Sequence, residues 1–162
     1  MTAKRIIDHL ERLMQLHESL FELSKKKTEA LKTNDTESLK AYLTRERKHV
    51  SAINTLEKKR MAAVEEWAAS EPDYDIESPT ISDILNWANW PERQKLQEVY
   101  DSFILVLADL KQQEVLNSEL IKQSLQFVNM SLELLQPSLQ NLNYGESSKP
   151  SEEKRSVFDS KA

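Results

Sequence analysis

The chain has 162 residues, a formal net charge of −5 and no cysteine, with 30% charged and 39% apolar residues. These values suit one helical domain with solvated faces, exclude disulfides and thiolate metal sites, and argue against the clustered basic surface of a nucleic-acid-binding protein. Gly145 is the only glycine. Because glycine most readily supplies positive-φ turns, the sequence predicts few of the tight turns that build sheets and catalytic loops.

The sequence also bears on cellular location. Met1 to Leu10 lacks the continuous apolar stretch of a signal peptide. No run approaches the roughly 18 apolar residues that a membrane span needs. We therefore expect a soluble, cytoplasmic protein without a membrane span.

The first predicted helix covers residues 2–32, where apolar residues recur at spacings of three, four and once seven. This stripe consists of Ile6, Leu10, Leu13, Leu16, Leu20, Leu23 and Ala30. Residues 33–36 break the pattern, and Asn34 with Glu37 resembles a capping box for a second helix.

The second predicted helix covers residues 35–70. Its apolar stripe is Leu39, Leu43, Val50, Ile53, Leu56, Met61, Val64 and Trp67. The short connection from the first helix predicts an antiparallel hairpin.

A short helix is predicted at residues 80–89, with Asp83 as the capping partner at its start. The pair Trp90-Pro91 then restarts the chain as a long helix over residues 91–136, because proline fits the first turn of a helix. The polar segment from Lys111 to Glu114 shifts the phase of the apolar stripe, as a coiled-coil stutter does. Pro137 is expected to end or kink this helix.

Together these segments predict an all-α fold. We expect an elongated antiparallel three-helix coiled-coil bundle over residues 1–142, with the short extra helix preceding the third long one. Residues 143–162 are rich in Ser, Lys and Glu and are expected to form a flexible tail.

The predicted helices differ in length. At about 1.5 Å per residue, the second spans on the order of 50 Å and the last about 70 Å, so its final ~10–14 residues lack a partner in the hairpin. That end is apolar around more than half of its circumference, which predicts a binding surface. The alternatives are that a homodimer or a bent hairpin covers it. The candidate partner-binding residues are Leu120, Ile121, Leu125, Phe127, Val128, Leu132, Leu135 and Leu139.

Aromatic residues bracket the turn between the second and third segments: Trp67, Tyr74, Trp87 and Trp90. We interpret them as a plug that closes one end of the bundle. A contact with a partner or a second copy is the alternative.

Catalytic chemistry has little support. Glu46 and His49 have the E-x-x-H spacing of di-iron bundles, but a second copy of the motif is missing, so a solvated charged face is the preferred interpretation. Gly-rich phosphate loops and recognisable nucleophile motifs are also missing. We expect no enzyme activity, no cofactor and no metal.

Several patterns, in this order and spacing, resemble the FlgN-type flagellar export chaperones. They are the turn residues Leu31, Asp35, Leu39, Leu43 and Glu46, then Leu56-Glu57-Lys-Lys-Arg60, then Asn117 to Phe127 with its N-x-x-L and S-L-x-F elements, then Tyr144-Gly145 and the end from Val157 to Ala162. The resemblance implies a cytoplasmic chaperone for type III secretion. Its clients would be hook–filament junction proteins, delivered to the flagellar export apparatus, and client binding would map to about Asn117–Leu142.

Two other functions compete with a chaperone. One is a structural coiled-coil protein whose apolar arc makes a permanent homodimer or an adaptor contact. The other is a metal-binding helical bundle enzyme.

Overall fold

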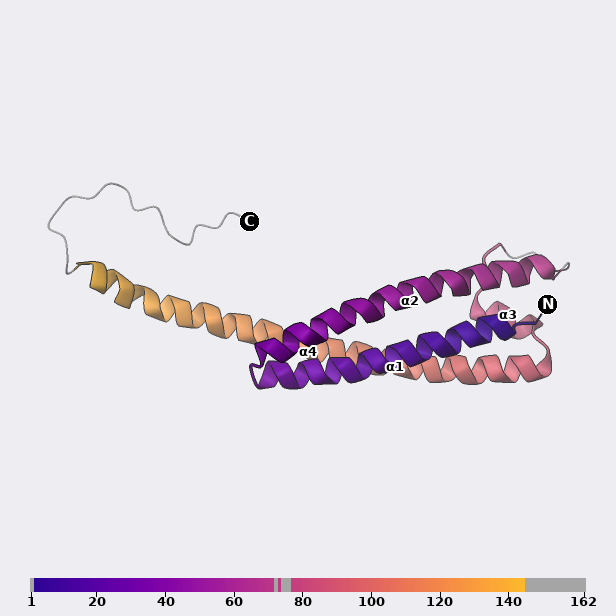
Figure 1. Ribbon diagram of the computed structural model, residues 1–162, viewed down its shortest axis with the longest axis horizontal. Helices are drawn as coiled ribbons and strands as arrows, with labels where there is room; N and C mark the ends of the chain where they lie inside the picture. The colour runs from indigo at the N-terminus through magenta and orange to yellow at the C-terminus, as the bar shows by residue number, and fades with distance from the viewer. Residues whose placement is uncertain (1, 72, 74–76, 145–162) are drawn as a thin grey trace. The chain divides into compact units, whose positions relative to one another are not determined.

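The computed structural model of the chain describes the backbone of residues 2–71, 73 and 77–144, and the side chains of these residues as far as 136 (Figure 1). It contains four helices: α1 (Lys4–Lys32), α2 (Thr36–Ser70), α3 (Ile81–Trp87) and α4 (Trp90–Tyr144). Within the described ranges every regular element is a helix, so the predicted all-α class is confirmed. The tail predicted from residue 143 lies outside the described residues from 145 onward.

The chain divides into two compact units, each described by itself below. Unit 1 covers residues 1–122 and unit 2 covers residues 123–162. Unit 1 contains α1, α2, α3 and the first part of α4, and the described portion of unit 2 is the remainder of α4.

One of the two outcomes predicted at Pro137 is wrong, because helix α4 does not end there but continues to Tyr144; the kink stays a prediction. Proline lacks an N–H group, so it cannot donate the bond to the carbonyl four residues earlier, and its ring crowds that carbonyl. The helix continues because one missing backbone bond does not remove the bonds of the turns before and after it.

The turn between α1 and α2 is built without glycine. Asn34 adopts a positive φ of 56°, a conformation that asparagine tolerates better than most residues. Asp35 N–H donates to the Ala30 carbonyl at 2.9 Å and Asn34 N–H donates to the Leu31 carbonyl at 3.4 Å. This pair of bonds is a Schellman motif, which terminates α1.

The cap of α2 is therefore not Asn34, as the sequence pattern predicts, but Asp35. Its carboxylate accepts from the backbone N–H of Ser38 at 3.1 Å. Asn34 is engaged in reversing the chain and so cannot cap the helix. The bonds to Ser38 lower the pKa of Asp35.

The start of α3 agrees with the prediction. Thr80 and Asp83 form a reciprocal capping box, with the Thr80 N–H donating to the Asp83 carboxylate at 2.8 Å and the Asp83 N–H donating to the Thr80 hydroxyl at 3.3 Å. Helix α4 then restarts at Trp90 with Pro91 in its first turn, where the missing N–H costs no helical bond.

Helices α1 and α2 lie alongside each other in unit 1 (Figure 1). Arg5 near the start of α1 pairs with Glu66 near the end of α2. Ser19 bonds to His49 at 2.7 Å, and Lys27 bonds to Glu46 at 2.7 Å. Residues later in α1 thus contact residues earlier in α2.

All four helices contribute to one hydrophobic core at the α3 end of unit 1. Its buried members are Ala3, Ile6, Ile7, Leu10, Ala63, Val64, Trp67, Ile84, Leu85, Leu96 and Val99. Ile6 and Leu10 belong to the predicted apolar stripe of the first helix, and Val64 and Trp67 to that of the second. Ile84 and Leu96 are fully buried, so α3 and the start of α4 are anchored by the same core.

The predicted aromatic plug is only partly correct. Trp67 is buried in the core with 3% exposure, whereas Trp87 is 47% exposed and Trp90 is 75% exposed. The buried residues that α3 contributes to this core are Ile84 and Leu85, so aliphatic side chains take the place expected for the Trp87 ring. Tyr74 lies outside the described residues.

We predict that Trp67→Ala destabilises the fold by about 3–5 kcal/mol, because it leaves a large cavity among four helices. Trp90→Ala is the matched control and should change the free energy of unfolding by less than about 0.5 kcal/mol. Urea unfolding followed by circular dichroism measures both. Equal effects of the two substitutions would contradict the placement of the core.

A second prediction concerns pH. The Thr80 bonds lower the pKa of Asp83 below the ordinary value of 3.8, so the unfolded chain takes up this proton first as the pH falls. The stability that Asp83 contributes is therefore present above pH 3.8 and is lost as the pH falls through the folded pKa. Asp83→Asn should lower the melting temperature at neutral pH and converge with the wild type in acid. A difference that stays constant with pH would contradict this assignment.

Candidate functional site

The candidate surface in unit 2 is formed by apolar side chains of α4 that remain exposed to solvent. The exposed fraction is 58% for Leu125, 66% for Phe127, 50% for Val128, 49% for Leu132 and 56% for Leu135. Two further residues of the predicted apolar arc, which the list of candidate binding residues leaves out, belong to the same region: Met130 is 54% exposed and Leu134 is 71% exposed.

These residues form two stripes on the helix. Leu125, Val128, Leu132 and Leu135 follow one another at spacings of three and four, and Phe127, Met130 and Leu134 do the same. At 3.6 residues per turn the two stripes lie on nearly opposite sides of α4. A helix that is apolar on two sides is typical of one that is buried from two directions.

Charge is nearly missing from this region. Between Gln123 and Gln136 the one ionisable residue is Glu133. Interface cores are depleted of charged residues in the same way, whereas solvated helix surfaces carry many charges. We define these seven apolar side chains of unit 2 as the distal face.

The remaining predicted binding residues lie elsewhere or cannot be placed. In unit 1, Leu120 is half-buried and Ile121 is 46% exposed. Leu139 lies outside the residues whose side chains are described. Asn117, where the family resemblance places the start of the client-binding portion, is 2% exposed. Its side chain is bonded within unit 1, and client binding from about Asn117 onward stays a prediction.

Asn117 belongs to a buried polar layer between α1 and α4. Its amide nitrogen donates to the carbonyl and to the hydroxyl of Ser24, both at 3.0 Å. Its amide oxygen accepts from the Thr28 hydroxyl at 2.5 Å, and Gln113 donates to the same hydroxyl at 2.5 Å. Buried polar groups bonded in this way favour one register over its neighbours.

Lys27 extends the layer to α2. Its ammonium group contacts Glu46 at 2.7 Å and Glu114 at 3.3 Å, and it is buried. Glu114 also accepts from the Ser24 hydroxyl at 2.6 Å. The polar segment from Lys111 to Glu114, which interrupts the apolar stripe of α4, is thus matched by polar residues on α1. We call Ser24, Lys27, Thr28, Glu46, Gln113, Glu114 and Asn117 the polar layer.

The E-x-x-H pair makes other contacts. The carboxylate of Glu46 bonds to Lys27, while the His49 ring bonds to Ser19 and to the Arg45 carbonyl. In the part of the chain that the structure describes, no group of three potential metal ligands gathers, and no helix is long and apolar enough to cross a membrane.

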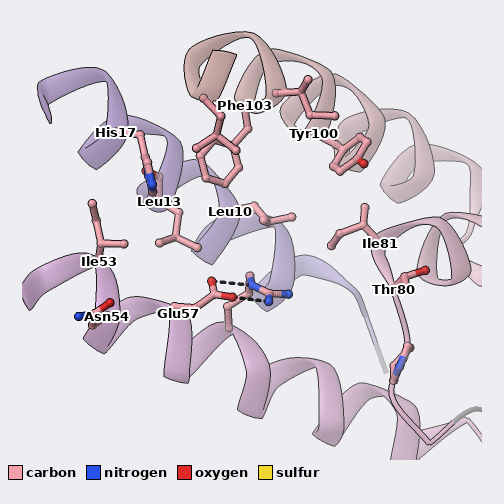
Figure 2. Close-up of a pocket in the computed structure, with 14 residues that line it drawn as sticks. Leu10, Leu13, His17, Ile53, Asn54, Glu57, Thr80, Ile81, Tyr100 and Phe103 are labelled. Atoms are coloured by element: carbon pink, nitrogen blue, oxygen red, sulfur yellow. Dashed lines mark hydrogen bonds and ion pairs between the residues drawn. The ribbon is translucent and has the colours of Figure 1, made fainter. Parts of the chain in front are cut away.

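A second apolar surface lies in unit 1, as a groove of about 470 Å³. Figure 2 shows Ile53 and Glu57 of α2 on one side, Tyr100 and Phe103 of α4 on the other, and Leu10 and Leu13 of α1 between them. The Phe103 ring meets the His17 ring edge-on, with centroids 5.0 Å apart. Sequence analysis did not predict this groove, because its apolar residues resemble core residues of a closed bundle.

The FlgN protein family model matches residues 1–152 of this chain. The chain belongs to the FlgN family. A protein of Bacillus subtilis (strain 168), named uncharacterized protein YvyG, is 38% identical over 165 aligned positions, which cover 100% of both chains. No solved structure matches the chain. The family is one of flagellar export chaperones rather than enzymes, which agrees with the resemblance seen in the sequence.

We predict that Asn117→Ala destabilises this FlgN-family protein by about 1–3 kcal/mol, since Thr28 and Ser24 lose bonds at a buried position. Asn129→Ala, on the exposed part of the same helix, is the control and should be near neutral. Thermal unfolding compares them. If Asn117→Ala were as stable as the wild type, the polar layer would not fix the register of α4.

Proposed function

We propose that this protein is a cytoplasmic export chaperone that binds flagellar hook–filament junction proteins through the distal face. Binding keeps the client from assembling early, and the complex then delivers it to the export apparatus for type III secretion. The proposal rests on membership of the FlgN family and on one observation above all, the exposure of the apolar side chains of the distal face.

The energetics favour a partner for this face. Burying one aliphatic or aromatic side chain is worth roughly 1.5–3 kcal/mol. Seven such side chains are about half to three-quarters exposed, so covering them would yield on the order of 10 kcal/mol before the costs of association. Exposed apolar surface of this extent on a protein usually marks an interaction site.

The chemistry points to an amphipathic helix as the ligand. The two stripes repeat at spacings of three and four, which match the side-chain spacing of another helix. A junction protein whose assembly helices still lack their final partners would present such apolar stripes. Binding needs no nucleotide, because covering those helices is enough to prevent polymerisation, and the export machinery would separate the pair.

The arrangement of the helices is also part of the proposal. The contacts of α1 with α2 and of α1 with α4 support an antiparallel three-helix bundle as the scaffold. In that arrangement the first part of α4 would pack within the scaffold, and the distal face would be available to the client.

The test is a double substitution, Phe127→Asp with Leu132→Asp, which places one charge on each stripe. It should abolish binding of a purified junction protein in calorimetry while far-UV circular dichroism stays unchanged, because both side chains are exposed in the free chain. The matched control, Gln126→Ala with Asn129→Ala, should bind within about twofold of the wild type. Undiminished binding by the double aspartate variant would refute the site.

A permanent homodimer through the distal face is the second candidate, favoured by the same exposed side chains. Sedimentation at micromolar concentration, with and without client, separates the two. A dimer that persists when client is present supports the homodimer, whereas a complex with one client replacing the dimer supports the chaperone. If the client displaces a homodimer, both complexes use the distal face, one after the other.

A further inference from the structure

Buried apolar side chains are unevenly distributed along unit 1. The hydrophobic core lies at the α3 end, and α4 contributes Leu96 and Val99 to it. After Val99, Asn117 is the one buried side chain of α4 as far as residue 136, the last whose side chain the structure describes. The apolar residues between Val99 and Asn117 are half-buried, as Leu110 is, or exposed, as Leu116 is. Buried apolar side chains therefore anchor α4 at the α3 end and not at the polar layer.

At the polar layer, hydrogen bonds and an ion pair join α4 to α1. Gln113 and Asn117 bond to Thr28, and Glu114 pairs with Lys27 at 3.3 Å. When α4 moves away from α1, water replaces each of these bonds, so the net loss for each bond is small. The ammonium and carboxylate groups also regain hydration, since the Lys27 side chain is only 9% exposed in the pair. An apolar contact has no such replacement, because water does not compensate an exposed apolar side chain.

The polar layer therefore opposes two movements of α4 to different degrees. A shift of α4 along α1 would leave Asn117 and Ser24 buried without their partners, which is costly. A movement of α4 away from α1 lets water reach the same groups and costs much less. The contacts of the polar layer thus select one register for α4 but hold the helix there weakly.

The length of α4 makes a small pivot sufficient to separate the polar layer. Asn117 lies 18 residues beyond Val99, a distance of about 27 Å along the helix. A pivot of roughly 10° at Val99 would move Asn117 by about 5 Å. Its two bonds to Ser24, both at 3.0 Å, would break and admit water. Helix α4 itself would stay intact, because long helices bend gently without losing their backbone bonds.

Such a movement changes which side chains of α4 are accessible. Leu120 is one of the predicted partner-binding residues and is half-buried while α4 is docked. It follows Asn117 by three residues and so lies on the same side of the helix. Separation at the polar layer would therefore expose Leu120 to solvent together with Asn117.

We propose that unit 1 opens reversibly at the polar layer. In the free protein, residues 111–122 of α4 leave α1 and return to the same register, while the core at the α3 end stays folded. The equilibrium between the docked and open states determines how much of α4 a partner can reach. The proposal goes beyond the proposed function, because opening needs no client and its tests contain none.

The first test is hydrogen exchange of the wild-type chain, followed by NMR at low urea concentrations. The side-chain amide of Asn117 is buried and bonded to α1, so its protons exchange when α4 leaves α1. Their protection factor should be at least tenfold below that of the Leu96 and Val99 backbone amides. It should also depend little on urea, because local opening exposes little surface. Equal protection and equal urea dependence would show that α4 leaves only on global unfolding, and would overturn the proposal.

The second test makes opening less favourable. Thr28→Val with Asn117→Leu replaces a bonded polar pair by apolar side chains of similar size, so water no longer compensates their separation. Leu120→Cys supplies the only thiol of the chain, and the paired substitutions should slow its reaction with a maleimide by roughly threefold or more. The matched control is Leu105→Cys, at a position that is 67% exposed, where the rate should stay unchanged. An unchanged rate at position 120, or equal slowing at both positions, would contradict the proposal.

Discussion

The hydrogen bonds of Asn117 with Ser24 and Thr28 determine which part of α4 the scaffold uses. They join positions 89 and 93 residues apart in sequence. The offset of 89 also relates two residues near the starts of these helices, where the Ala3 N–H donates to Glu92 at 3.2 Å. An apolar seam alone would tolerate a shift by one turn, because leucines replace one another at helical spacing. Buried polar partners do not, since a shifted register would leave each of them without a bond.

This constraint connects stability to function. With Asn117 held against α1, Leu96 and Val99 of α4 enter the core of unit 1, and the side chains of the distal face stay exposed. A protein that displays so many apolar side chains gives up stabilisation that a closed fold would gain. A chaperone has a use for that arrangement, because free energy not gained in its own folding remains for binding a client.

Much of the fold could be predicted from the sequence. The positions of all four helices follow from the apolar spacing, the capping pair Thr80 and Asp83, and the proline at position 91. Local patterns failed where two interpretations compete. Asn34 resembles a helix cap, yet it adopts the positive φ of the turn between α1 and α2. Glycine usually fills such a position, and this turn contains none. Pro137 resembles a terminator, yet the helix continues through it. The exposure of Trp87 and Trp90 depends on how the helices pack, which the local sequence does not determine.

Of the candidate surfaces, one could be predicted from the sequence and two could not. The distal face could be predicted from length and composition, because the last predicted helix is longer than the second and its end is apolar and carries almost no charge. The polar layer could not be recognised, since Ser24, Thr28 and Asn117 resemble ordinary surface residues until α1 and α4 are aligned. The groove likewise depends on how far α2 and α4 stand apart over α1, and its apolar residues resemble core residues when the sequence is considered alone.

The central claim is that the distal face is open in the free protein and closed by a client. The most direct measurement is the reaction rate of a maleimide with Leu132→Cys, in a chain with no other thiol. In the isolated protein at submicromolar concentration the rate should approach that of an unprotected thiol, and saturating junction protein should slow it by roughly tenfold or more. A thiol that is already protected in the isolated protein, or one that reacts equally fast in the complex, would contradict the account.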